Sequence, residues 1–106
     1  MQSIHLDQIL ERELVPGYHV RFVHSDNVTL AYWRVETQAS LPVHSHPHEQ
    51  IVNLLEGQFE LTVAGEKVLL SPGQVVLIPP NAPHAGRALT DCRILDVFYP
   101  VREGYR

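Results

Sequence analysis

Hydrophobic and polar residues alternate along most of the chain after residue 17, which is the period of a half-buried β-strand. Tyr18–His24 alternates in this way, and Val28–Thr37 is rich in the β-branched and aromatic residues that favour strands. Turn-forming residues such as Ser25-Asp26-Asn27 separate these segments. The same pattern predicts further strands at 50–57, 58–65, 67–70, 74–78, 84–89 and 92–99.

Helical periodicity is weak throughout the chain. Residues 4–14 predict at most one helical turn or a loose arm, which Pro16-Gly17 ends. Closely spaced short strands with turns between them are typical of a β-sandwich or barrel. Among these all-β folds, a jelly roll buries its edges and encloses a cavity at one mouth. We therefore expect one domain over residues 1–106, with an arm at 1–16, a barrel at 17–100 and a tail at 101–106.

Composition narrows the class of protein. The 106 residues suit a single domain, and the one cysteine, Cys92, cannot form an intramolecular disulfide, which favours a reducing compartment. A net charge of −4 argues against a general nucleic-acid binder. The first residues lack a signal-peptide pattern, and no apolar run is long enough to span a bilayer. We expect a cytoplasmic protein without nucleic-acid or membrane partners.

Three histidines lie within five residues in the segment "LPVHSHPHEQ". Side chains alternate along an extended chain, so His44 and His46 should point to the same face. Pro47 cannot donate to a strand ladder, so we expect a kink that releases His48. Gln50 begins the next strand and can return to the face of His44 and His46.

A further imidazole, His84, follows the irregular loop "IPPNAP" far along the chain. A second hairpin that brings His84 to the first pair would complete a transition-metal site, because imidazole is a common metal ligand. The other histidines are most simply ordinary surface or core residues: His5, His19, His24 and His48.

"HSHPHEQ", with a glycine following, and "GQVVLIPPNAPH" resemble the two motifs of the cupin superfamily. The first motif has two histidines separated by one residue, then an acidic ligand and a glycine; the second has a glycine, a proline and a histidine. The resemblance implies a double-stranded β-helix, or jelly roll, that binds one divalent metal ion. The matching positions are His44, His46, Gln50 and Gly57 in the first motif, and Gly73, Pro79 and His84 in the second.

Three positions depart from the cupin pattern, but none removes a histidine. Gln50 replaces the usual glutamate, and Asn81 replaces a glycine in the turn of the second motif. Ala88 stands where that motif usually ends in asparagine.

Together with the tail "LDVFYPVREGYR", the motifs resemble more closely the KdgF-like small cupins of pectin and uronate degradation. That resemblance implies ring opening of 4,5-unsaturated monouronates from pectin or alginate to linear keto sugars. It also implies His44, His46, Gln50 and His84 as metal ligands, and Asp96, Phe98 and Arg102 as catalytic residues. Resemblance to small cupins further implies a homodimer, to which the segment before Pro16 would add or exchange a strand.

The residues agree with this chemistry. Three neutral imidazoles and a neutral amide leave a divalent metal its full charge, so the centre should bind an anionic sugar. Nitrogen-rich ligation suits Ni, Zn, Fe, Co, Cu or Mn, and the sequence does not choose between them. Asp96 lies in the apolar run "RILDVFYP", where a charged side chain is unexpected unless it has a function. Arg102 can contact a carboxylate with two N–H groups.

Two other functions fit the same residues. The metal shell with iron or copper would also suit a cupin dioxygenase, which consumes oxygen. A non-enzymatic cupin that binds a small molecule would hold the ligand without turnover.

Overall fold

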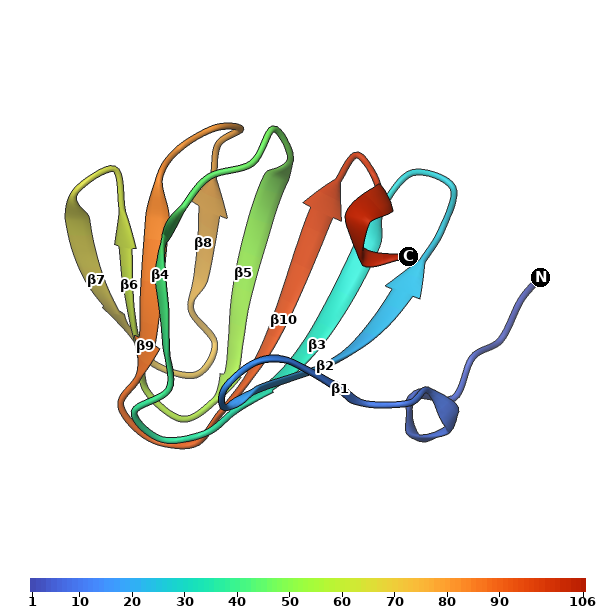
Figure 1. The fold of residues 1–106 in the computed structure, drawn as a ribbon, viewed down its shortest axis with the longest axis horizontal. Helices are drawn as coiled ribbons and strands as arrows, with labels where there is room; N and C mark the ends of the chain where they lie inside the picture. Colours follow the sequence, from blue (N-terminus) through green and yellow to red (C-terminus); the bar gives the residue numbers. More distant parts are fainter.

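The computed structural model describes all 106 residues and contains ten strands and two short 3₁₀ turns (Figure 1). Neither turn has the length or apolar character of a membrane-spanning helix. The turns are η1 (Leu6–Gln8) and η2 (Glu103–Tyr105); the strands are β1 (Arg12–Val15), β2 (Tyr18–His24), β3 (Thr29–Val35), β4 (Ser40–His44), β5 (Glu49–Glu56), β6 (Phe59–Val63), β7 (Glu66–Leu70), β8 (Val75–Ile78), β9 (His84–Ala88) and β10 (Cys92–Tyr99).

The strands form two antiparallel sheets that face each other (Figure 1). One sheet has the order β1-β2-β3-β10-β5-β8, and the other has the order β4-β9-β6-β7. Strands far apart in sequence are neighbours, as in β10 between β3 and β5. This arrangement confirms the predicted all-β jelly roll.

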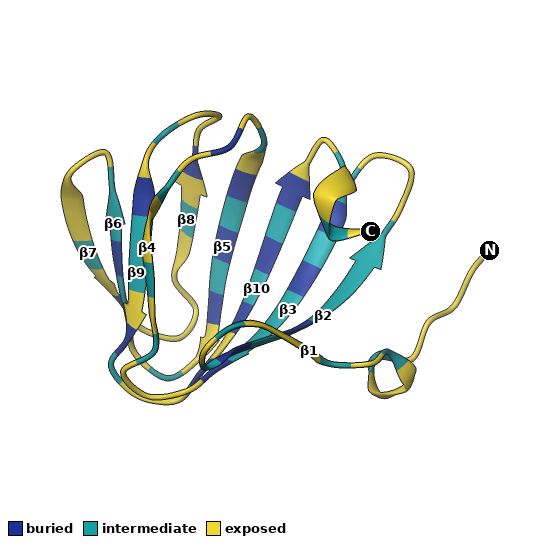
Figure 2. Cartoon of the chain, in the orientation of Figure 1, coloured by how far each residue is buried: buried dark blue, intermediate teal, exposed yellow.

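The core lies between the two sheets, where alternate residues of the central strands are buried (Figure 2). In β5, the buried positions are Gln50, Val52 and Leu54. In β10, Ile94, Asp96 and Phe98 belong to the inward-facing set. The strand period therefore carries two polar side chains into the interior beside apolar ones.

Two strands, β1 and β4, were not predicted from the sequence. β4 pairs with β9, and β1 pairs with β2 inside the segment expected to be a loose arm or helical turn. Neither strand buries a full face, so neither shows the alternation by which the other strands were predicted.

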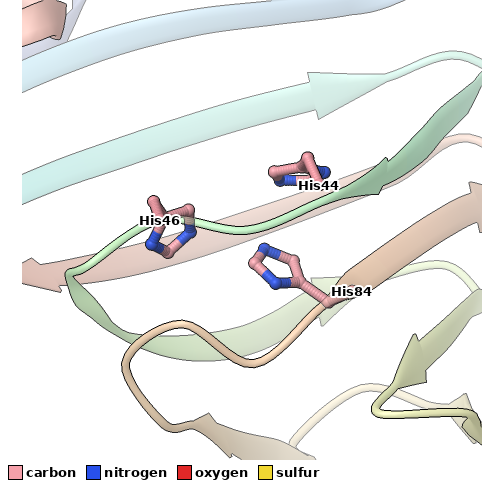
Figure 3. A group of neighbouring side chains, drawn as sticks. All are labelled: His44, His46 and His84. Carbon is pink, nitrogen blue, oxygen red and sulfur yellow. The ribbon is translucent and has the colours of Figure 1, made fainter.

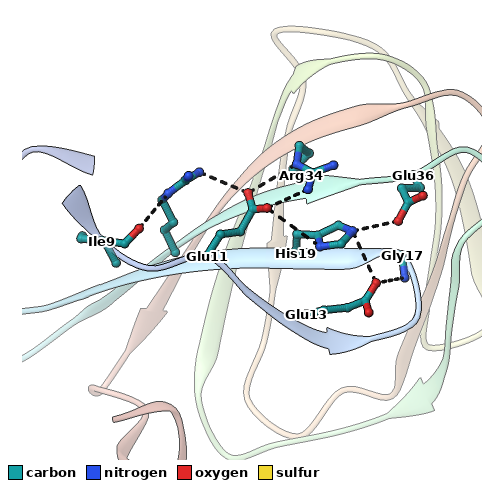
Figure 4. A network of polar contacts seen from close by, with 8 residues as sticks. Ile9, Glu11, Glu13, Gly17, His19, Arg34 and Glu36 are labelled. Atoms are coloured by element: carbon teal, nitrogen blue, oxygen red, sulfur yellow. Dashed lines mark hydrogen bonds and ion pairs between the residues drawn. The ribbon is translucent and has the colours of Figure 1, made fainter. Parts of the chain in front are cut away.

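The start of β1 is fastened to the sheet by Glu11, which precedes it (Figure 4). Its carboxylate accepts hydrogen bonds from Arg34 at 2.7 Å and from Arg21 at 3.2 Å. On the next strand over, His19 lies 2.8 Å from Glu36 and 3.5 Å from Glu13. These side chains connect β1, β2 and β3 on the outer face of the sheet.

The backbone conformation of two turns accounts for the residue types at two positions of the cupin motifs, Gly57 and Asn81. Gly57 has φ of +89°, and a Cβ there would lie 2.2 Å from the carbonyl oxygen of Asp91. Only glycine satisfies both demands. Asn81 also lies in the left-handed region, with φ of 66°, as expected from its tolerance of that conformation.

Candidate metal centre

Three imidazoles converge at one end of the space between the sheets (Figure 3). His44 and His84 are directly opposed on β4 and β9, and their ring centres are 4.2 Å apart. His46 follows β4 by two residues, with its ring centre 4.9 Å from that of His84. One ring nitrogen from each of the three lies within 4.8 Å of the others. The pairing of β4 with the distant strand β9 thus brings together the three histidines of the predicted site.

Each of these rings is oriented by a backbone carbonyl. The Nδ1 atoms of His44 and His84 lie 2.9 Å from the carbonyl oxygens of Pro42 and Ala82. Nδ1 of His46 lies 3.0 Å from the carbonyl oxygen of His48. A carbonyl can only accept, so each Nδ1 carries the proton and each Nε2 presents a lone pair. Such outer contacts are the usual way in which a protein orients histidine ligands.

Gln50 completes the donor set from β5. Its Oε1 lies 3.0 Å from Nε2 of His46, although both atoms are acceptors in this tautomer. Nε2 of His84 is buried and has no hydrogen-bond partner. A cation shared by these lone pairs would satisfy all of them, so the residues present fit a metal ion.

The imidazoles of His46 and His84 are neutral near pH 7. Burial, together with the positive charge of Arg102, lowers the pKa of His46 to about 4. Burial also lowers the pKa of His84, helped by the charges of His44 and Arg102. Metal binding needs the neutral imidazole, so these shifts favour it.

A cavity of about 60 Å³ opens beside the imidazoles and continues into a second space of about 110 Å³ toward the C-terminus. His44, Gln50 and Asp96 line both spaces. Asp96 is 7% exposed, and its Oδ1 has no partner. Burial raises the pKa of Asp96 to about 7, against the opposing effects of Gln50, Trp33 and Arg102.

The remaining two predicted residues border the outer space. Phe98 is 2% exposed, and its ring centre lies 5.6 Å from that of His46 at a steep angle. The guanidinium carbon of Arg102 lies 4.9 Å above the Phe98 ring. Six of the seven predicted site residues therefore line one or both of these spaces, and the seventh, His46, contacts His84, Gln50 and Phe98 beside them. His48 contributes its carbonyl to the site through His46, while its ring lies outside the group of three.

Sequence reasoning missed two residues that line the cavity, Trp33 and Tyr105. The indole nitrogen of Trp33 is buried without a partner, and Tyr105 contacts Arg102. Trp33 looked like an ordinary strand aromatic, and Tyr105 like part of a tail. No local pattern signals contacts that depend on how distant segments pack.

The fold and the histidine site define a cupin, and comparison with known families agrees. The model of the cupin domain matches residues 31–98, so the chain belongs to the cupin family. Its structure is similar to that of KdgF from Halomonas sp., with a TM-score of 0.94, 26% identity, and coverage of 100% of this chain and 99% of that one. An RmlC-like cupin from Shewanella frigidimarina has a TM-score of 0.91, 25% identity, and coverage of 99% and 98%.

Two curated relatives are longer proteins. The chain is 29% identical over 94 residues to the H2HPP isomerase of Bacillus subtilis, covering 86% of this chain and 40% of that protein. It is 38% identical over 55 residues to the L-ectoine synthase of Thermobifida fusca, covering 50% of this chain and 41% of that protein. The chain thus spans about two fifths of the length of each.

Proposed function

We propose that this cupin is a metal-dependent isomerase that opens 4,5-unsaturated monouronates to linear keto sugars. The observation that carries the proposal is a buried carboxyl group, Asp96, in the wall of two neighbouring spaces, with the uncharged histidines beside one and an arginine beside the other. Such a cavity suits a small anion that undergoes proton transfer. The likeness to KdgF and to an isomerase supports this class of function.

The ligands His44, His46, Gln50 and His84 would hold one divalent metal ion. When bound, it supplies a Lewis acid that stabilises negative charge developing on a substrate oxygen. Because no ligand carries a charge, the ion keeps its full attraction for an anion. Together with Arg102, it gives a cationic pocket to a chain whose net charge is −4.

Ring opening moves one proton from oxygen to carbon. The anomeric hydroxyl loses its proton, the bond between C1 and the ring oxygen breaks, and C1 becomes an aldehyde. The freed oxygen on C5 is then that of an enolate, and protonation at C4 gives the ketone, so substrate and product are isomers. Asp96, with its pKa near neutrality, suits both removal and return of the proton.

Arg102 has a separate role in this proposal. Its planar guanidinium offers paired N–H donors that match a carboxylate. By holding the substrate carboxylate at the outer end of the cavity, it would fix the ring with its reacting atoms toward Asp96 and the metal.

The test is to incubate metal-loaded protein with unsaturated galacturonate and follow the absorbance of the conjugated double bond. The wild type should remove it faster than the uncatalysed background. Asp96→Asn should lower the rate about 10²–10⁴-fold with unchanged metal content. Asp26→Asn, on an exposed turn, is the matched control and should behave as the wild type.

Other outcomes identify other functions. If the metal-loaded wild type leaves the double bond intact, the uronate proposal fails. Oxygen uptake with another substrate would then favour a dioxygenase. Saturable binding of a sugar acid without turnover would favour a binding module.

A further inference from the structure

Arg102 has no acidic partner, unlike most arginines of this chain. Ion pairs with glutamates hold Arg21, Arg34, Arg87 and Arg93, but no carboxylate lies within 4.0 Å of the Arg102 guanidinium. Its contacts are aromatic instead. The guanidinium carbon lies 4.1 Å from the ring centre of Tyr105 and 4.9 Å from that of Phe98.

The two rings form a corner around the cation. Phe98 and Tyr105 have ring centres 5.9 Å apart and planes at 77°. An aromatic face attracts a cation through its negative charge density, without using the cation's hydrogen-bond donors. The N–H groups of Arg102 therefore remain available to an incoming carboxylate, whereas an acidic neighbour would have occupied them.

Tyr105 is itself held in place from two strands. Its ring stacks on Phe22 of β2, with centres 4.4 Å apart and planes at 25°. Its carbonyl oxygen accepts a hydrogen bond from Nη2 of Arg12 on β1 at 3.1 Å, and lies 3.3 Å from Nε2 of His24 on β2. The 3₁₀ turn closes through the Tyr105 N–H, which donates to the carbonyl of Arg102 at 3.0 Å.

A hydrogen-bond chain ties both ends of this turn to the sheet. The backbone N–H of Arg102 donates to Oγ1 of the fully buried Thr29 at 2.9 Å. That hydroxyl lies 2.8 Å from Nδ1 of His24 and can donate to it. Nε2 of His24 then carries the proton that faces the Tyr105 carbonyl.

We propose that Tyr105 is a positioning residue for Arg102, resting on the substrate-binding role of Arg102 in the proposed function. Its ring holds the guanidinium at the outer end of the cavity with free N–H donors, and the contacts with β1 and β2 hold the ring. Without this ring, Arg102 keeps its charge but loses its fixed direction.

The first test observes Arg102 without substrate. In the nuclear magnetic resonance spectrum of the metal-loaded protein, the Arg102 Nε–H signal should be displaced by the ring currents of its two neighbours. The signal is assigned by its absence in Arg102→Ala. It should stay displaced in Tyr105→Phe and move to the position of a free arginine in Tyr105→Ala. An unchanged signal in Tyr105→Ala would overturn the proposal.

The second test uses kinetics with unsaturated galacturonate. Tyr105→Ala should raise KM by about 2- to 30-fold, the equivalent of one cation–π contact, with a smaller change in kcat. Tyr105→Phe should restore the wild-type KM. In an Arg102→Ala background, Tyr105→Ala should add nothing, because both changes remove the same interaction. Additive losses, or equal damage by Tyr105→Phe, would contradict the positioning role.

The control is Arg106→Ala, in the same tail. Arg106 contacts Glu103 and the carbonyl of Ser25 but none of the groups around Arg102, so its removal should change neither signal nor KM. Failure of the proposed function can be distinguished from failure of the positioning role of Tyr105. A wild type that does not convert the sugar refutes the proposed function, while the resonance still decides the position of Arg102.

Discussion

Gln50 would set the charge of the proposed metal site. It occupies the position where the cupin pattern usually has a glutamate, and the side chain still reaches His46. An amide coordinates through oxygen but adds no charge, so an ion bound here stays fully cationic. A neutral ligand at this position leaves more positive charge to attract an anionic substrate. It would bind the metal less tightly than a carboxylate would.

Replacing Gln50 by glutamate tests this balance. Gln50→Glu should tighten metal binding and raise KM for the uronate, because the added carboxylate neutralises half the charge of a divalent ion. Chelator competition measures the first effect and initial rates the second. A variant with unchanged KM would show that the charge of the centre does not govern substrate binding.

The lowered histidine pKa values predict how metal content depends on pH. Free imidazole takes up a proton near about pH 6.5, whereas the pKa of His46 is about 4 and that of His84 is also lowered. Protons compete with the metal at each of these imidazoles only near and below its folded pKa, so metal content should fall at a lower pH than it would with unshifted imidazoles. Elemental analysis after dialysis at stepped pH measures this. Release with a midpoint near 6.5 would contradict it.

At the residue scale, the grouping of the three histidines was predictable and the cavity walls were not. His44, His46 and Gln50 are local in sequence, but they approach one another from β4, from the loop after it and from β5 of the other sheet, not along one strand face. His84 needed the second motif. Tyr105 reaches the cavity only because the tail folds back over β2, a long-range contact that leaves no periodic trace.

Among the elements, β1 buries no residue, and the polar contacts of Glu11, just before it, hold it to the sheet. Glu11 bridges Arg21 and Arg34, and the hydrogen bond from Arg34 lowers its pKa. Leu14 and Val15 of β1 line the outer space of the cavity, so the anchoring of this strand shapes the mouth of the site.

Glu11→Gln should therefore loosen β1. A carboxylate whose pKa falls on folding stabilises the protein above its unfolded pKa, and this stabilisation is lost as pH drops through the folded value. At pH 7 we expect a loss of about 0.5–1 kcal/mol in unfolding free energy, since the group is partly exposed. Urea denaturation should show the difference narrowing toward about pH 4. Glu103→Gln, which removes an exposed ion pair, is the control and should have a smaller effect.

Strands that bury one face were predicted from alternation, and edge strands were not. β5 and β10 carry a regular buried set, so their pattern is visible in the sequence. β1 has no buried residue, and β4 is also largely exposed. Pairing rather than burial makes these two segments strands, because β1 pairs with the adjacent β2 and β4 pairs with the distant β9.

Part of the outer face of the larger sheet, over β3, β10, β5 and β8, is apolar. Aligned residues cross four strands in two rows without a charged side chain, and Asn53 donates its amide to the carbonyl of Leu95. An antiparallel sheet open to water normally presents polar residues there. The rows are Leu30, Val97, Ile51 and Leu77, and Tyr32, Leu95, Asn53 and Val75.

The homodimer expected from the sequence remains a prediction, and this face suggests how to test it. Light scattering should give twice the 12.0 kDa chain mass at micromolar concentration. Leu77→Glu, at a position 67% exposed, should halve that mass by placing a charge on the apolar face. Leu69→Glu, 56% exposed on the other sheet, should leave it unchanged. A wild-type mass of one chain would refute the prediction.

The direct opposition of His44 and His84 on β4 and β9 has a consequence for handling the protein. A metal held by both side chains staples the outermost strand of the smaller sheet to its neighbour, much as a cross-strand disulfide would. Chelation removes that staple and leaves an irregularly paired edge free to fray. Frayed edges recruit other chains. Purification in strong chelators should therefore yield turbid, short-lived preparations, and metal in the storage buffer should extend their life.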